Sequence, residues 1–179
     1  MKILFFGDIH GIDTNLNVIE RKIEEEHIDK LVSLGDLYYQ GPTPDKKYDV
    51  NSKNVIDFLN KHKDKLICMK GNCDSSVDIK VSDFPILDTL SLINVDNLDI
   101  YITHGDIYNY EKNNFNYKGI LVHAHKHIPY IKKEKDTTYI CVGSISLPRE
   151  KNNPTYAVYS NKEITIYDIY DNIVNKISL

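Results

Sequence analysis

Residues 3–11 read ILFFGDIHG, a short apolar run followed by a glycine and then by an aspartate and a histidine. Similar junctions place Asp36 directly after Gly35 and Asn72 directly after Gly71, each just beyond another short apolar run. Runs of this kind, bounded by glycine and polar residues, are typical of buried strands. Open α/β sheets bind ligands beyond the carboxyl ends of their strands, so we expect these polar side chains to converge at one edge of a sheet.

The first half of the chain alternates predicted strands with predicted helices. The strands are expected at 3–6, 31–34 and 66–69. Between them lie two predicted helices, the first capped by Asp13 or Thr14 and the second by Ser52. Apolar residues recur at helical spacing in both, at Leu16, Ile19, Ile23, Val55, Phe58 and Leu59. This β-α-β-α-β order predicts a parallel sheet.

The second half is richer in strand-like runs, and turns too short for a helix join most of them. These runs are 88–93, 98–103, 119–122, 138–142, 156–159 and 164–169. They predict a second, largely antiparallel sheet that packs face to face with the first, with the helices outside. The segment 40–54, which contains Pro42 and Pro44, is expected to be a surface loop that shapes a pocket beside Asp36.

Length and composition predict a single domain, residues 1–179, with a substantial hydrophobic core. The chain has 179 residues, of which 41% are hydrophobic and 27% are charged. Its net charge of -4 and its only two arginines, Arg21 and Arg149, offer little to a nucleic-acid polymer, which binds clustered basic groups. A small anionic substrate remains compatible with this charge if bound metals make the local field positive.

Cysteine usage and the amino terminus bear on location. The three cysteines, Cys68, Cys73 and Cys141, cannot all pair, and none forms a CxxC motif. They favour a reduced compartment. The amino terminus becomes polar at Asp8, too early for a signal peptide or a membrane span. We therefore expect a cytoplasmic protein with no membrane partner.

Oxygen and nitrogen ligands for metal ions are spread along most of the chain. They are Asp8, His10, Asp36, Asn72, His104, His125 and His127. Alternate residues of an extended segment point the same way, so Asp8 and His10 can face one ion, and so can His125 and His127. One Asp-x-His motif carries little specificity, but all these motifs in this order predict a site for a pair of divalent metal ions.

In this order the motifs resemble those of the calcineurin-like metallophosphoesterase superfamily, and within it the YfcE-type phosphodiesterases. The resemblance rests on Gly7–Gly11, Gly35-Asp36, Gly41-Pro42, Lys70–Ser75, Thr103–Gly105, Ala124–Pro129 and Gly143–Pro148. It implies an α/β fold, a four-layer α-β-β-α sandwich in which helices flank two packed mixed sheets, with a dinuclear metal centre at one edge.

The resemblance also implies a ligand set and a reaction. The first metal would be held by Asp8, His10, Asp36 and His127, and the second by Asn72, His104 and His125, with Asp36 bridging both. The implied enzyme is a metal-dependent phosphodiesterase, a phosphoric ester hydrolase in which a metal-bridging hydroxide attacks a small phosphate ester in line with the leaving group. Two ions carry about four positive charges, and two aspartates and the hydroxide return about three, which leaves a surplus that attracts phosphate. Manganese is the expected metal, with zinc, iron and nickel as alternatives.

Four further residues are candidates for supporting or substrate-binding roles: Cys73, Asp74, His123 and Arg149. Cys73 stands where many members of the superfamily have a histidine that helps to protonate the leaving group, and a thiol is a poor substitute at neutral pH. A cysteine at this position therefore favours phosphodiesters with good leaving groups over alkyl monoesters. Asp74 is expected to orient ligands, His123 to line or support the site, and Arg149 to contact a substrate phosphate.

Two other functions remain open at this stage. One is a catalytically weak interaction scaffold, similar to the retromer subunit that shares this fold; that subunit lacks the histidine corresponding to His10, which this chain retains. The other is a phosphomonoesterase acting on nucleotides, which Cys73 makes less favourable. The sequence leaves the natural substrate, the physiological metal and the oligomeric state undecided, and it is compatible with a homo-oligomer.

Overall fold

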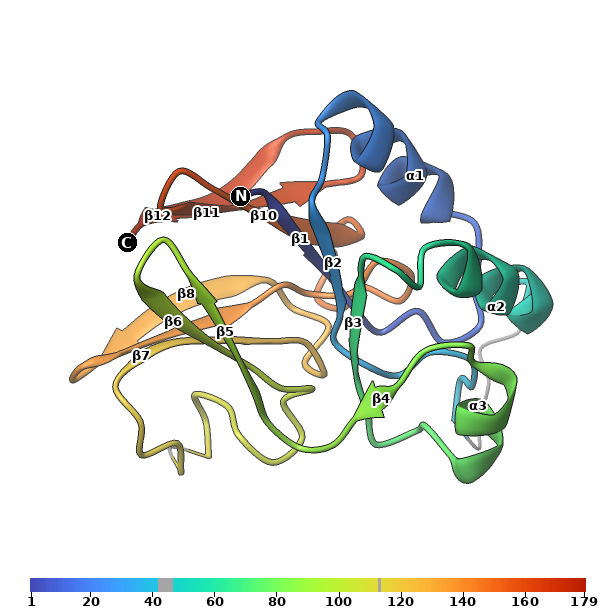
Figure 1. The fold of residues 1–179 in the computed structure, drawn as a ribbon, viewed down its shortest axis with the longest axis horizontal. Coiled ribbons are helices and arrows are strands. Elements are labelled where there is room, and N and C mark those ends of the chain that lie inside the picture. The colour runs from blue at the N-terminus through green and yellow to red at the C-terminus, as the bar shows by residue number, and fades with distance from the viewer. Residues whose placement is uncertain (42–46, 113) are drawn as a thin grey trace.

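The structure is a computed structural model, and it describes residues 1–41, 47–112 and 114–179. Two β-sheets stack face to face (Figure 1). The first contains, in spatial order, β12 (Ile173–Ser178), β11 (Glu163–Asp168), β10 (Thr155–Ser160), β1 (Ile3–Phe6), β2 (Lys30–Ser33), β3 (Leu66–Met69) and β4 (Ile86–Leu87). The second contains β5 (Ser91–Val95), β6 (Leu98–Ile102), β7 (Gly119–His123), β9 (Thr137–Cys141) and β8 (Tyr130–Glu134).

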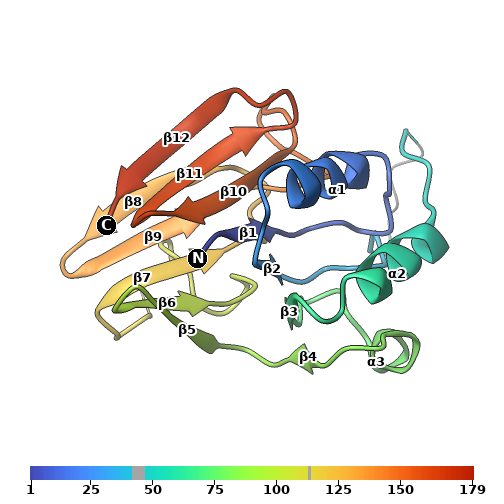
Figure 2. The same cartoon turned by 45° about the horizontal axis from the view of Figure 1, so that its top comes forward.

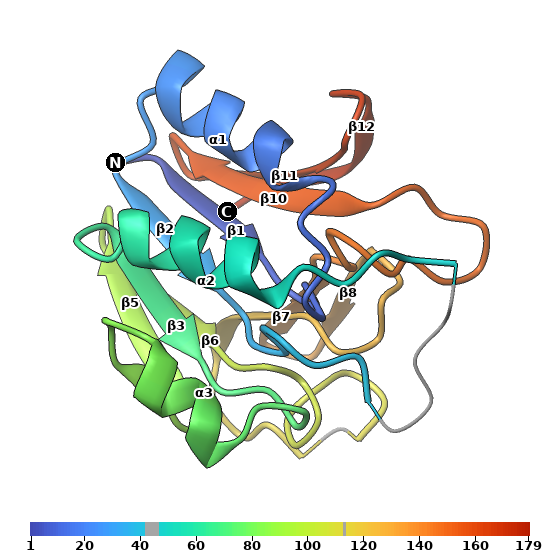
Figure 3. The ribbon, with the colours of Figure 1, turned by 90° about the vertical axis from the view of Figure 1, so that its right-hand side faces the viewer.

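Three helices accompany the first sheet. They are α1 (Leu16–Glu25), α2 (Ser52–Lys61) and α3 (Ser76–Val81). Figure 2 shows α1 and α2 over the first sheet, on the side away from the second sheet, and α3 beside the edge strand β4. The view onto the helices in Figure 3 shows β1 and β2 running beneath α1 and α2. The parallel strands β1, β2 and β3 are therefore covered on both faces, as a parallel sheet requires, whereas the edge strand β12 is mostly exposed.

Strand β1 shows how one apolar run serves two cores. Leu4 and Phe6 belong to the core under α1 and α2, whereas Ile3 and Phe5 belong to the core between the sheets. Successive strand residues point to opposite faces, so all four side chains are fully buried. This explains why residues 3–6 read as a continuous apolar run and do not alternate with polar residues.

The two sheets differ from the predicted pairing. In the first, the pairs from β1 to β4 are parallel, and the pairs that add β10, β11 and β12 are antiparallel. The predicted strands at 156–159 and 164–169 thus belong to the first sheet. The second sheet is mixed, because β7 pairs in parallel with both β6 and β9. The prediction of a largely antiparallel second sheet was wrong, because irregular chain between β6 and β7, and β8 between β7 and β9, act as crossovers.

The predicted class, an α/β fold with two packed mixed sheets, is confirmed. On the outer face of the second sheet, the described residues form irregular chain between β6 and β7 and no helix. Phe115 from this segment packs on Leu121 of β7 and Tyr139 of β9. Aromatic side chains here do the covering that helices do on the first sheet.

The helix caps differ from the predicted ones. The N-cap of α1 is Asn15, whose side-chain amide donates a hydrogen bond to the carbonyl oxygen of Ile145 at 2.8 Å and does not cap the helix. The N-cap of α2 is Asn51, whose side chain accepts a main-chain N–H of the first turn. Ser52 is the first residue of α2, and its hydroxyl donates to the carbonyl oxygen of Tyr38 at 2.8 Å. Hydrogen bonds to distant segments thus occupy Asn15 and Ser52, whereas α2 has a local side-chain cap at Asn51.

Several elements were not predicted. Besides β4, β8 and β12, the short helix α3 was missed, although Ser75 and Asp78 form a capping box at its start. The predicted loop at 40–54 overlaps the start of α2, which begins at Ser52, and Pro42 and Pro44 lie outside the described residues. Within the three described ranges, no helix is long and apolar enough to span a membrane.

Candidate metal centre

The seven residues proposed as metal ligands lie together at one end of the two sheets. Each follows the carboxyl end of a strand, and both sheets contribute. They are Asp8 and His10 after β1, Asp36 after β2, Asn72 after β3, His104 after β6, and His125 and His127 after β7. Strand ends that are far apart in the chain thus bring carboxylate, amide and imidazole groups to one place.

One set of ligand atoms surrounds the carboxylate of Asp8. The Nε2 atom of His127 lies 3.6 Å from Asp8 Oδ1, and the Nε2 atom of His10 lies 4.0 Å from the same oxygen. The two Nε2 atoms are 3.4 Å apart, and the rings are stacked. His10 Nε2 is also 3.6 Å from Oδ2 of Asp36.

A second set surrounds His104. Its Nε2 atom lies 3.0 Å from Oδ1 of Asn72 and 3.2 Å from Nδ1 of His125. The same nitrogen is 3.5 Å from Oδ2 of Asp36. Asp36 Oδ2 therefore lies between the two sets, close to one imidazole nitrogen of each.

Main-chain carbonyl groups fix the orientation of three of the four imidazole rings. The Nδ1 atoms of these rings lie 2.7, 2.8 and 2.5 Å from carbonyl oxygens, in the pairs His10 with Tyr39, His104 with Leu34 and His127 with Leu147. A carbonyl oxygen can only accept, so each Nδ1 carries the proton. In its neutral form each ring then directs the lone pair of its Nε2 atom into the centre, as in the supporting contacts of metal-bound histidines.

This arrangement leaves acceptor atoms facing one another. Asp8 Oδ1 is buried and has no hydrogen-bond partner among the described residues, and it lies beside the facing Nε2 atoms of His10 and His127. Buried acceptors without donors cost free energy, and a cation among them removes that cost. Carboxylate oxygens with imidazole nitrogens and an amide oxygen suit divalent transition metals. The residues present therefore fit metal ions.

Burial sets the protonation of the metal-free centre. It raises the pKa of Asp8 to about 8 and lowers the pKa values of His125 and His127 to about 4. At neutral pH these two imidazoles are neutral and ready to bind a metal, whereas the Asp8 carboxyl gives up a proton when a metal binds.

The backbone at the centre is strained. Asp8, His10, Asp36, His125 and His127 all have positive φ angles, between 52° and 65°. Side chains with a Cβ atom rarely adopt this left-handed conformation, and such strain collects at functional sites. The prediction that the two pairs of alternating ligands point the same way on extended segments was wrong, because tight turns orient them instead.

Two glycines allow the turns after β2 and β3 to touch. A side-chain carbon at Gly71 would overlap the Asp36 carboxylate, and one at Gly35 would overlap the main chain of Gly71. Gly35 also has a φ of +92°. No other residue fits these positions without moving Asp36.

Asp74 holds the same two turns together. Its buried carboxylate accepts main-chain N–H groups from Asp36 at 2.9 Å, Leu37 at 2.7 Å and Gly71 at 2.7 Å. Three hydrogen bonds to one carboxylate fix the loop that carries Asp36. Asp74 is thus placed to position a ligand and does not itself face the metal-binding atoms.

A cavity of about 330 Å³ opens onto the centre. Besides the ligand residues, its walls include Gln40, Cys73, Lys126, Leu147 and Arg149. The main-chain N–H of Cys73 donates to Asp36 Oδ1 at 2.8 Å. Burial, and then the charge of Asp36, raise the pKa of its thiol to about 12, so Cys73 is protonated at neutral pH.

His123 lies outside both ligand sets. It is fully buried, with Nε2 at 3.0 Å from the hydroxyl of Tyr130 and Nδ1 at 3.0 Å from the carbonyl oxygen of Ala124. Both ring nitrogens therefore have partners away from the centre. Burial lowers the pKa of His123 to about 4.

Gln40 was not singled out from the sequence, although it begins the segment 40–54 that was predicted to shape a pocket beside Asp36. It precedes Gly41 in a polar loop and belongs to no motif. Both polar atoms of its side chain are buried and have no partner in the described part of the chain.

The geometry agrees with a comparison against protein families. Residues 1–163 match the model of the calcineurin-like phosphoesterase superfamily domain. The chain belongs to the calcineurin-like phosphoesterase superfamily. As a member of this superfamily it is a phosphoric ester hydrolase of the metal-binding type, and the resemblance inferred from its motifs is confirmed.

Known relatives of this phosphoesterase match it over almost its whole length. Phosphodiesterase YfcE of Escherichia coli strain K12 is 29% identical over 175 residues, which span 96% of this chain and 94% of that protein. The solved structure of YfcE, a phosphoesterase from E. coli, superposes with a TM-score of 0.91 at 26% identity and covers 99% of both chains. The probable metallophosphoesterase YsnB of Bacillus subtilis is 25% identical over 187 residues, 99% of this chain and 95% of that one.

The buried, neutral state of His123 predicts a pH-dependent stability. Its pKa is about 4 in the folded protein and about 6.5 in the unfolded chain, so its stability contribution is complete above pH 6.5 and is lost as the pH falls toward 4. Between about pH 7.5 and pH 5, the metal-free protein should lose about 2 kcal/mol more unfolding free energy than the His123→Phe variant. Urea denaturation at both pH values measures this difference.

The comparison isolates His123 because the wild type and the variant share every other titrating group of the centre. The variant also leaves the Tyr130 hydroxyl without His123, but that loss is the same at both pH values. Equal losses of stability in the two proteins would show that His123 is charged, or solvated, in the folded state.

Proposed function

We propose that this phosphoesterase is a metal-dependent phosphodiesterase that hydrolyses a small phosphate ester at a dinuclear centre, through in-line attack of a hydroxide on phosphorus. The position of Asp36 carries the proposal: Oδ2 lies 3.6 Å from His10 Nε2 in one ligand set and 3.5 Å from His104 Nε2 in the other. A carboxylate shared in this way suits two cations.

The two sets divide the ligands between two ions. Asp8, His10, Asp36 and His127 would hold the first, and Asp36, Asn72, His104 and His125 the second. When bound, the ions supply Lewis acidity toward the phosphoryl oxygens and lower the pKa of water to near neutrality. Manganese is the proposed metal, and zinc, iron and nickel suit the same donors.

Cationic and neutral groups of this chain favour an anionic substrate. Asn72 contributes an amide oxygen and no charge, so it leaves more of the positive charge of the ions available to phosphate. Arg149 adds positive charge to the cavity wall, whereas the ammonium group of Lys126 is paired with Glu111. A small phosphodiester is therefore the proposed partner, and the free cysteines support a reduced, cytoplasmic location.

Cys73 limits the substrates that the enzyme can use. Its thiol faces the cavity but keeps its proton at Sγ, because the pKa of the thiol is raised to about 12. It is therefore a weak proton donor to a departing oxygen. This supports phosphodiesters with good leaving groups over nucleotide monoesters, and the complete ligand set supports an enzyme over an interaction scaffold.

Metal-dependent hydrolysis of bis(p-nitrophenyl) phosphate tests the function directly. The protein, freed of metal by chelation, should release no p-nitrophenol, and added Mn²⁺ should restore turnover by at least about a hundredfold, because the ions supply most of the transition-state stabilisation. Absorbance at neutral pH follows the reaction. A folded protein that stays inactive with Mn²⁺, Zn²⁺, Fe²⁺ and Ni²⁺ would support the scaffold.

The shared carboxylate predicts a joint loss of metal. Asp36→Ala should reduce about two bound ions per chain to fewer than about one, since both sets lose a ligand. Elemental analysis after dialysis against Mn²⁺ and gel filtration gives the number. Asp106→Ala is the matched control, because Asp106 lies near His104 but outside both ligand sets, and it should keep both ions. Loss of a single ion from Asp36→Ala would refute the shared role.

The role of Cys73 predicts a change in selectivity. Cys73→His places a better acid at the leaving group, so turnover of an alkyl monoester such as β-glycerol phosphate should rise by about tenfold relative to that of bis(p-nitrophenyl) phosphate, whose p-nitrophenolate leaves without a proton. The ratio of the two kcat/KM values is the measurement, and Cys73→Ser is the control that adds no acid of suitable pKa. An unchanged ratio in Cys73→His would mean that leaving-group protonation does not limit monoester hydrolysis.

A further inference from the structure

Gln40 lines the cavity of the metal centre, and its side-chain amide has unused hydrogen-bonding capacity. Neither Nε2 nor Oε1 has a partner among the described residues, although both atoms are buried. Gln40 lines the same cavity as His10, Asp36 and Arg149. Buried polar groups in native proteins almost always have a hydrogen-bond partner, so the two free atoms of the Gln40 amide indicate a site for a ligand.

The main chain that leads to Gln40 is held in place. The carbonyl oxygen of Tyr39 accepts from Nδ1 of His10 at 2.7 Å, and that of Tyr38 accepts from the Ser52 hydroxyl at 2.8 Å. The carbonyl oxygen of Leu37 accepts from the main-chain N–H of Gly11 at 2.9 Å. Gln40 is thus presented from a segment tied to the metal centre itself, as a preorganised binding residue requires.

The amide needs a partner that both accepts and donates. A phosphate oxygen at neutral pH can only accept, so it can satisfy Nε2 of Gln40 but not Oε1. An amide-like edge, with a carbonyl or ring-nitrogen acceptor beside an N–H donor, satisfies both atoms at once. Nucleobases carry such edges, and glutamine binds adenine in this bidentate manner.

The size and charge of the cavity agree with such a substrate. About 330 Å³ is at the lower end of the range for pockets that bind small organic molecules, and it exceeds the volume that a phosphate group alone would fill. Arg149 provides positive charge for the diester, and Leu147 adds one apolar contact.

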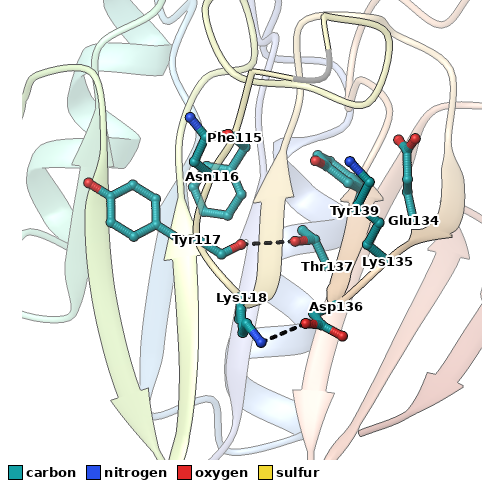
Figure 4. Close-up of a pocket in the computed structure, with 9 residues that line it drawn as sticks. All are labelled: Phe115, Asn116, Tyr117, Lys118, Glu134, Lys135, Asp136, Thr137 and Tyr139. Carbon is teal, nitrogen blue, oxygen red and sulfur yellow. Dashed lines mark hydrogen bonds and ion pairs between the residues drawn. The ribbon is translucent and has the colours of Figure 1, made fainter.

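Another cavity of the protein differs from the metal-centre cavity in that polar groups along its wall have partners. It has a volume of about 240 Å³ and lies where the start of β7 meets the turn between β8 and β9 (Figure 4). There the Thr137 hydroxyl donates to the carbonyl oxygen of Tyr117 at 2.9 Å, and Lys118 pairs with Asp136 at 2.7 Å. The polar groups named here have partners within the protein, whereas the Gln40 amide has none among the described residues.

We infer that Gln40 determines substrate specificity by binding an amide-like edge on one arm of the phosphodiester. The inference rests on the proposed phosphodiesterase function and narrows its substrate class to diesters in which one arm carries a nucleobase or a group with the same edge. The other arm is the leaving group.

Matched substrates test the inference in the wild-type enzyme. The p-nitrophenyl ester of thymidine 5′-monophosphate has an N3–H donor between two acceptors, and its N3-methyl analogue lacks only the donor; both release p-nitrophenol. The Mn²⁺-loaded wild type should prefer the first by about tenfold or more in kcat/KM, since a site with an unpaired acceptor rejects a substrate without the donor. Equal rates for the two esters would overturn the inference.

Substitution of Gln40 completes the comparison. Gln40→Met keeps the length of the side chain and removes its hydrogen bonds, so the preference for the unmethylated ester should fall to within about twofold. Gln40→Leu is the second variant, and circular dichroism establishes that each is folded. A preference that survives both substitutions would assign the recognition to another residue and would overturn the role of Gln40.

A binding measurement separates this inference from the proposed function. Gln40 is the only glutamine of the chain, so selective ¹⁵N labelling of glutamine side chains gives a single NH₂ pair in the NMR spectrum. In the Zn²⁺-loaded protein, thymidine 5′-monophosphate should shift this pair, and inorganic phosphate should not. An equal shift with phosphate would mean that Gln40 contacts the phosphoryl group, against the inference.

Different results would contradict the phosphodiesterase function and the role of Gln40. An enzyme that hydrolyses no p-nitrophenyl diester with any of the metals contradicts the proposed function, and the NMR titration still decides whether Gln40 binds the base. An enzyme that hydrolyses bis(p-nitrophenyl) phosphate but does not distinguish the two thymidine esters keeps the function and loses the role of Gln40.

Discussion

The carboxylate of Asp36 is the point on which the architecture of this site depends. Oδ2 lies between His10 and His104, and Oδ1 accepts the main-chain N–H of Cys73 at 2.8 Å. Asp74 holds the main chain of Asp36, and Gly71 leaves room for its side chain. Because so many contacts fix one carboxylate, it can lie between two cations without the freedom to favour either one.

Polar contacts at the site link the two sheets. Ligands on the first sheet meet ligands on the second, and hydrogen bonds cross between them: the main-chain N–H of His125 donates to Asp8 Oδ2 at 2.8 Å, and His104 Nδ1 donates to the carbonyl oxygen of Leu34 at 2.8 Å. The core between the sheets brings the strand ends together, and these polar contacts then set their exact spacing. The free-energy cost of the left-handed turns at the ligands is offset by the burial of apolar side chains in that core.

Much of the fold and the candidate site could be predicted from sequence, because a glycine and a polar residue after an apolar run mark the end of a buried strand. Asp8, Asp36 and Asn72 were found in this way. The left-handed turns at His125 and His127 could not be predicted, since histidine adopts a positive φ more often than most residues but still in only a small minority of cases. Contacts with distant segments, which local patterns do not record, also decided the helix caps and the parallel pairs of β7.

The role of Gln40 could not be predicted from the sequence for a different reason. Its importance lies in hydrogen bonds that the folded chain does not make, and a sequence cannot display a missing partner. Asp74 is intermediate, because its place after Asn72 and Cys73 indicated a supporting role, but the three N–H groups that it accepts come from two separate turns.

Main-chain carbonyl groups, and not the cations, orient the rings of His10, His104 and His127. The cage is therefore a feature of the polypeptide that persists when its contents leave. Metal ions that enter such a cage would meet three imidazole rings already turned toward them, so replacing one transition metal by another would need no reorientation of these histidines.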